Sequence, residues 1–142
     1  MHLHVVMSTR MRMRLFKSRV IWEAFERAVE KSCKECGGHL LHIEAGIIEP
    51  GKGRRHIYST AHMQVLLQGE VGPKQLTEVI RQNTWEELKG IGEEAPSRNP
   101  LTKDFYIADD AHYSGKEALR FIRNRLPLKA KEEEDAKLPG NP

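Results

Sequence analysis

Apolar side chains cluster or alternate in four short stretches that predict β-strands. Residues 3–7 form an apolar run with β-branched valines, and the alternating Arg-Met stretch of residues 10–15 would extend it. Residues 40–48 and 57–68 predict a second and a third strand, which a loop with one proline and two glycines separates. These two strands could pair as a hairpin. Residues 105–108 predict a short fourth strand.

Apolar residues at three- and four-residue intervals predict three helices around these strands. The first covers residues 18–38, from a serine N-cap to two consecutive glycines. The second covers residues 73–92, because proline is tolerated in the first turn and glycines end the pattern. The third covers residues 114–127, from a serine and glutamate with capping-box spacing to a proline.

The elements follow one another as strand, helix, strand, strand, helix, strand, helix. This order predicts an α+β fold, a ferredoxin-like antiparallel four-stranded sheet with its helices on one face. Residues 1–127 would form a single domain. Residues 128–142 are charged and lack aromatic side chains, so we expect a flexible C-terminal tail that cannot bury enough surface to order itself.

The composition narrows the class of protein. The chain has 142 residues, 39% hydrophobic and 30% charged, which is typical of a soluble globular domain. It contains no apolar run long enough to span a bilayer, and its start lacks the pattern of a secretory signal. We therefore expect a cytoplasmic protein with no membrane partner. Two cysteines exclude a framework of several disulfides.

The distribution of basic residues is more informative than the net charge of +3. One basic run follows the first strand, and a second lies in the loop between the second and third strands. On an extended chain, every second residue of the first run would point to the same side. Two such runs could neutralise a phosphate backbone, although they could also be ordinary solvated surface. The candidate nucleic-acid contacts are Arg10, Arg12, Arg14, Lys17, Arg54 and Arg55.

Residues 61–68, Ala-His-Met-Gln-Val-Leu-Leu-Gln, resemble the strand that carries the His-hydrophobic-His motif of single-tyrosine insertion-sequence transposases and their REP-associated relatives. The resemblance extends over residues 3–126, mainly through the order of the elements. In that family the two histidines hold one divalent metal ion that polarises the scissile phosphate. A tyrosine on the last helix then attacks the phosphate.

This sequence departs from the family pattern at three positions. His62 matches the first histidine, but Gln64 replaces the second, and Phe121 stands where the nucleophilic tyrosine would align. Arg125 replaces the glutamine that completes the metal site, and a permanent cation there opposes metal binding. The resemblance therefore implies a degenerate active site, with His62 and Gln64 as a doubtful metal pair.

The resemblance implies a nucleic-acid-binding protein whose cleavage chemistry is lost and which needs no cofactor. Its expected partners are single-stranded or hairpin DNA, or structured RNA, and a second copy of the chain as a homodimer. A shifted alignment is the alternative, in which Tyr106 or Tyr113 is the nucleophile of an active single-strand DNA transposase or nickase that uses Mg²⁺ or Mn²⁺. A third possibility is a non-enzymatic protein-interaction module.

Two further groups of residues have metal-ligand chemistry. Cys33, Cys36, His39 and His42 are zinc-ligand types, but all four lie within ten positions, and two histidines three apart on a strand would face opposite sides. Asp109 and Asp110 follow the fourth strand directly and form the best acidic candidate for a hard cation such as Mg²⁺. A turn filled by acids is the alternative explanation for them.

Overall fold

The computed structural model describes residues 1–9, 16, 18–48, 58–92, 95–103 and 105–121. Within these ranges the chain is an α+β protein with four strands and three helical segments, as the sequence pattern predicts. The third helical segment covers residues 115–121. The other elements are β1 (His2–Ser8), α1 (Arg19–Glu35), β2 (Gly38–Ile48), β3 (Tyr58–Leu67), α2 (Pro73–Lys89) and β4 (Tyr106–Asp109).

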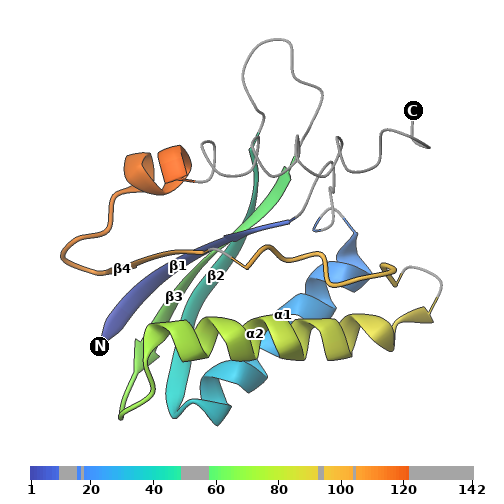
Figure 1. The fold of residues 1–142 in the computed structure, drawn as a ribbon, viewed down its shortest axis with the longest axis horizontal. Helices are drawn as coiled ribbons and strands as arrows, with labels where there is room; N and C mark the ends of the chain where they lie inside the picture. The colour runs from blue at the N-terminus through green and yellow to red at the C-terminus, as the bar shows by residue number, and fades with distance from the viewer. Residues whose placement is uncertain (10–15, 17, 49–57, 93–94, 104, 122–142) are drawn as a thin grey trace.

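The four strands form one antiparallel sheet in the order β2-β3-β1-β4. β1 is therefore central, with Val5 opposite Met63 of β3 on one side and Ile107 of β4 on the other. The expected hairpin of β2 with β3 forms, and its register shifts between Leu40 and His42. Both α1 and α2 lie on the same side of the sheet (Figure 1).

The core lies between this sheet and the two long helices. Alternate residues of β1 point into it, and Val5 and Met7 are fully buried. β3 contributes every second residue in the same way, including Met63 and Val65. Helical spacing places a matching apolar stripe on each helix. The largest fully buried helix residues in this core are Phe25, Val29, Leu76, Ile80 and Leu88.

The predicted ends of α1 are confirmed. The Ser18 side chain caps the helix by accepting a hydrogen bond from the backbone N–H of Ile21 at 3.4 Å. After the helix, Gly37 takes a φ of +73°, a conformation that other residues rarely adopt. At Gly38 a Cβ atom would lie only 2.5 Å from the carbonyl oxygen of Leu66. The two glycines thus let the chain turn sharply from α1 into β2.

The third helical segment lies against the opposite face of the sheet, whereas the sequence had predicted helices on one face. Ala118 packs with Val6 of β1 in a small apolar cluster that includes Tyr106 and Phe121. Its first turn is capped by Ser114, whose side chain accepts from the backbone N–H of Glu117 at 3.2 Å. Val6 lies between the core residues Val5 and Met7 of β1 and therefore points to the outer face. Its apolar side chain there packs against the third helical segment.

Several predicted features lie outside the described residues. These are the extension of the first strand over residues 10–15, the basic loop at 49–57, the end of the third helix at Pro127 and the tail at 128–142. Among the helices that the structure does describe, none is long and apolar enough to cross a membrane.

The tight approach at Gly38 gives the first testable prediction. Gly38→Ala should lower the free energy of unfolding by about 1–3 kcal/mol, because backbone atoms of β3 block the added methyl group. Gly90→Ala is the matched control, since Gly90 has a φ of −88° and its Cβ would make only a 3.5 Å contact. It should stay within about 1 kcal/mol of the wild type in urea denaturation. Equal effects at both positions would contradict this account of the turn.

Candidate functional site

The outer face of the sheet carries a cluster of polar side chains at its centre. His2 and His4 of β1 alternate with the core residues, and so do His62 and Gln64 of β3. The antiparallel register places His4 opposite Gln64 and Val6 opposite His62, so these side chains share one face. Three more side chains, described below, join them from β2 and from the turn after β4.

Four of these side chains form a continuous hydrogen-bonded relay across the sheet. Nε2 of His4 lies 2.9 Å from Oδ1 of Asp110. Nδ1 of His4 lies 3.0 Å from Nε2 of His62, and Nδ1 of His62 lies 3.3 Å from Oε1 of Glu44. We call Asp110, His4, His62 and Glu44 the relay. It runs from carboxylate through two imidazoles to a second carboxylate, and His4 in its middle is only 6% exposed.

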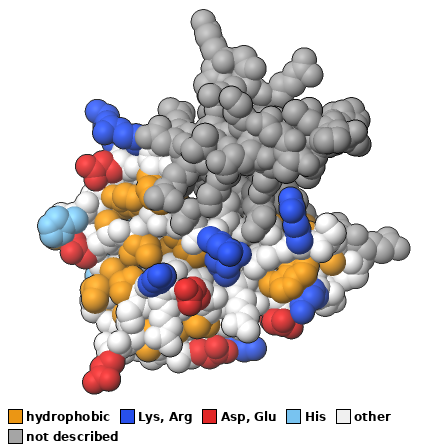
Figure 2. All heavy atoms as spheres, viewed as in Figure 1, with side chains coloured by type: hydrophobic (Ala, Val, Ile, Leu, Met, Phe, Trp, Pro, Cys, Tyr) orange, Lys and Arg blue, Asp and Glu red, His pale blue; other side chains and the backbone are white. Residues whose placement is uncertain are grey.

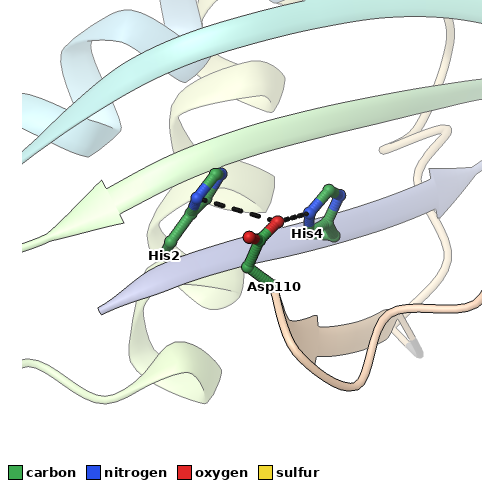
Figure 3. A group of neighbouring side chains, drawn as sticks. All are labelled: His2, His4 and Asp110. Atoms are coloured by element: carbon green, nitrogen blue, oxygen red, sulfur yellow. Dashed lines mark hydrogen bonds and ion pairs between the residues drawn. The ribbon is translucent and has the colours of Figure 1, made fainter.

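His2 lies beside the relay and shares its carboxylate. Nε2 of His2 is 3.2 Å from Oε1 of Gln64, and its Nδ1 is 3.8 Å from Oδ1 of Asp110. Figure 3 shows both imidazole rings directed toward that carboxylate from alternate positions of β1. Among the residues that the structure describes, His2, His4 and Asp110 are the one group whose ligand atoms are close enough to hold a metal ion.

Tyr113 covers the two imidazoles at the centre of the relay. Its ring is stacked on His4 with a centroid distance of 4.1 Å and on His62 with a distance of 5.0 Å. The backbone N–H of Tyr113 donates to the carbonyl oxygen of Asp109 at 2.9 Å, which holds the turn that presents it. Tyr106 of β4 makes an edge contact with the Tyr113 ring at 6.2 Å.

The local environment sets the charge states of these groups. Burial lowers the pKa of His62, and the hydrogen bond with Glu44 acts in the opposite direction. Hydrogen bonds with histidines lower the pKa values of Asp110 and Glu44, so both are carboxylates at neutral pH. Burial raises the pKa of Tyr113, with Tyr106 and Glu44 adding to the effect. The site therefore has ionised acids at both ends of the relay and a neutral phenol above it.

The structure places the predicted site residues that it describes in different parts of the outer face. His62 and Gln64 belong to the polar cluster, but Phe121 lies in the apolar cluster around Val6, 6.0 Å from the Tyr106 ring. Of the two alternative tyrosines, Tyr113 is the one stacked on the histidines. All six basic candidates fall outside the described residues, namely Arg10, Arg12, Arg14, Lys17, Arg54 and Arg55, and so does Arg125.

Sequence reasoning missed three residues of the cluster: His2, His4 and Glu44. A signal for two of them was present, because His2-Leu3-His4 has the same His-hydrophobic-His spacing as the motif sought around His62. The prediction treated this stretch as an apolar strand alone. Asp110 was named as an acidic candidate, although nothing in its local sequence shows that it meets two histidines of β1.

The cysteine-histidine quartet does not assemble in the structure. Cys33 and Cys36 are buried in the core between helix and sheet. The irregularity after Leu40 pairs His39 with Leu66 and His42 with Gln64, which places both histidines on the outer face. The expectation that the two histidines face opposite sides was therefore wrong, since an extra residue in the strand restores their common orientation.

Comparisons with protein families and curated proteins give no functional assignment, so the chemistry of the site is inferred from its geometry. No family model matches this chain, and no curated protein matches it. What the site offers chemically is a set of nitrogen and oxygen ligands, a buried imidazole (His4) beside a half-buried one (His62), and an adjacent phenol. Such a set can bind a cation or move a proton, and its position on an outer sheet face leaves it accessible to a large ligand.

The buried thiols give a second testable prediction. Burial raises the pKa of the Cys33 thiol from 9.0 to about 12, and Cys36 and Glu30 add to the shift. At pH 8 the native thiol is therefore almost entirely protonated and should react with an alkylating agent at least about 100-fold more slowly than in the unfolded chain. Mass-spectrometric labelling of a Cys36→Ser variant isolates Cys33. Rapid labelling of the native form would show that the thiol is accessible and activated.

Proposed function

We propose that this chain is a transposase-like nucleic-acid-binding protein that binds single-stranded or hairpin DNA. The proposal keeps the ferredoxin-like assignment, which the strand order β2-β3-β1-β4 and the placement of α1 and α2 on one face support. It also includes a homodimer, because the 11-residue β2 lies at an edge of the sheet and, among the strands that the structure describes, pairs only with β3. The observation that carries the proposal is the anchoring of both basic segments at one residue, Ser59.

Ser59 is buried at the start of β3 and holds the chain on both sides of the first basic segment. The backbone N–H of Thr9 donates to the carbonyl oxygen of Ser59 at 3.0 Å. The backbone N–H of Phe16 donates to the Ser59 hydroxyl at 3.2 Å. The second basic segment joins β3 directly before Ser59, since β3 begins at Tyr58. The two segments therefore leave the fold at the same end of the sheet.

Covalent geometry then keeps the basic residues together. Residues 10–15 lie between the two anchored positions, and Arg54 is five residues from Ser59. An extended chain spans at most about 3.6 Å per residue, and each of the six basic candidates is at most five residues along the chain from Thr9, Phe16 or Ser59. Such a group of cations on one end of a sheet can follow several consecutive phosphates of a strand.

The outer face adjoining this end offers aromatic surface for bases. Tyr113 is half-buried and stacked on the imidazoles of His4 and His62, and the half-buried Tyr106 contacts the Tyr113 ring. Base stacking on such rings is tolerant of sequence. By contrast, Figure 2 shows acidic and basic side chains mixed among the described residues of its visible face. These residues form no extended region of a single charge there. The proposed DNA path therefore runs from the basic segments onto the outer face.

Charge removal tests this function. The triple variant Arg10→Ala, Arg12→Ala, Arg14→Ala should bind hairpin DNA at least about tenfold more weakly and lose roughly two units of the salt slope, because each phosphate contact releases counterions. The matched control is Arg27→Ala, Lys31→Ala, Lys89→Ala, which removes the same charge from exposed positions of α1 and α2. Fluorescence anisotropy at several salt concentrations measures both quantities.

An RNA hairpin and an unstructured oligonucleotide complete that experiment. Stronger binding of the RNA hairpin would replace DNA by structured RNA as the partner. Equal losses in the two triple variants would contradict binding through the anchored segments and would favour a protein-interaction module. Light scattering of the free chain checks the homodimer.

A second candidate function is metal-dependent DNA strand cleavage by Tyr113, and the stacking of Tyr113 on His4 and His62 favours it. In this reaction the phenol oxygen attacks phosphorus and the bond to the 3′ oxygen breaks. The products are a 5′-phosphotyrosine and a free 3′-hydroxyl, which takes up a proton while the phenol loses one. The raised pKa of Tyr113 opposes this step, and a bound Mg²⁺ or Mn²⁺ would counter it.

Substitution of the two tyrosines distinguishes this second function. Incubation with labelled hairpin DNA and Mn²⁺ should give a covalent adduct that survives denaturation, and Tyr113→Phe should abolish it because the attacking oxygen is gone. Tyr106→Phe is the matched control and should retain it. Adduct formation is read by denaturing gel electrophoresis. The absence of any adduct in the wild type, with DNA binding intact, would leave binding without cleavage as the function.

A further inference from the structure

The atoms of His2, His4 and Asp110 that face one another have the spacing of a metal site. One ligand atom from each lies within 4.8 Å of the others. Oδ1 of Asp110 is 2.9 Å from Nε2 of His4 and 3.8 Å from Nδ1 of His2. Two ligand atoms that are each about 2.1 Å from one zinc ion are roughly 3–4 Å apart, so these separations need little adjustment.

The hydrogen bond from His2 to Gln64 determines which nitrogen of His2 is free. The amide oxygen of Gln64 can only accept, so Nε2 of His2 carries the proton and donates it at 3.2 Å. In the neutral ring Nδ1 is then unprotonated, and its lone pair faces the Asp110 carboxylate. Two electron-rich atoms oriented toward each other require a positive charge between them.

A separate count of hydrogen-bond donors in the relay also indicates a need for one additional positive charge. Its three hydrogen bonds need three N–H protons, because the carboxylates at both ends only accept. Two neutral imidazoles supply only two, so the third hydrogen bond requires either a protonated imidazole or a bound cation in place of one proton. If a cation takes the place of the proton at Nε2 of His4, then Nδ1–H of His4 donates to His62 and Nδ1–H of His62 donates to Glu44. Every remaining bond is then satisfied with both rings neutral.

We propose that His2, His4 and Asp110 bind one divalent transition-metal ion, through Nδ1 of His2, Nε2 of His4 and a carboxylate oxygen of Asp110. Two imidazoles and one carboxylate suit zinc and its neighbours, whereas Mg²⁺ prefers all-oxygen ligands. Three protein ligands leave a coordination position for water or a phosphate oxygen. The Asp110 side chain is 64% exposed, so that position can be reached from solvent.

The surrounding residues would hold these ligands in place. Metal-bound histidines usually donate their second ring N–H to a neighbouring acceptor, which fixes the ring orientation. Gln64 would do this for His2, and His62, itself held by Glu44, would do it for His4. His62 and Gln64 are thus assigned as positioning residues around the ion, in place of the direct ligands that the sequence resemblance implies.

Metal titration without nucleic acid tests this site separately from DNA binding. Isothermal titration calorimetry of the full chain with ZnCl₂ should give one bound ion per chain. His2→Ala and Asp110→Asn should each weaken binding more than about 100-fold, and Gln64→Leu about 10- to 100-fold. The Co²⁺-loaded chain should lack thiolate charge-transfer absorption, because no cysteine is a ligand. Thermal melting confirms that each variant is folded.

The neighbouring pair Asp109 and His112 supplies the matched control. Its Oδ1 and Nδ1 atoms are 2.7 Å apart in the same turn, so it is also a carboxylate beside an imidazole. Asp109→Asn and His112→Ala should leave zinc affinity unchanged. In the wild type, substoichiometric Mn²⁺ should selectively broaden the imidazole NMR signals of His2 and His4. Zinc binding that survives in a combined His2→Ala, Asp110→Asn variant, or broadening elsewhere, would overturn the proposal whatever the DNA experiments show.

Discussion

The antiparallel pairing of β1 with β3 is the constraint on which the rest of the structure depends. Both strands are central in the sheet, and in both, side chains that point into the core alternate with side chains on the outer face. The same register that places Val5 opposite Met63 in the core places His4 opposite Gln64 outside. A slip of one residue would bring imidazoles into the apolar layer, so burial of the core also specifies the site.

The outer face contains a buried polar side chain, which needs hydrogen-bond partners that the apolar core residues do not need. His4 is almost as buried as a core residue, and burying a polar ring costs free energy unless both its nitrogens have partners. Those partners come from β3 on one side and from the turn after β4 on the other. Tyr113 then covers the pair of rings and limits their contact with water. The result is a polar site with defined geometry on the outer face of the sheet, beside the apolar cluster around Val6.

Periodicity was sufficient to predict most of this fold. Ser18 and the glycines after α1 were recognisable because capping and positive φ have local causes, and the four strands follow from alternation. The site was harder, because Asp110 meets His4 across 106 positions of sequence. Local patterns say nothing of such pairing. The common orientation of His39 and His42 was equally hidden, since one extra residue in β2 reverses the side that alternation predicts. His62 was found through a motif, and His2 and His4 were overlooked although they show the same spacing.

The late position of Asp110 in the chain has a consequence for synthesis. During translation β1 emerges first, and it can pair with β3 once residue 67 is available, which brings His4 to His62. The carboxylate that completes the group arrives more than forty residues later with the turn after β4. A nascent chain would therefore have its hydrophobic core largely assembled while the cluster still lacked one of its acids. The full group of His2, His4 and Asp110 would form only after the turn that follows β4 had been synthesised.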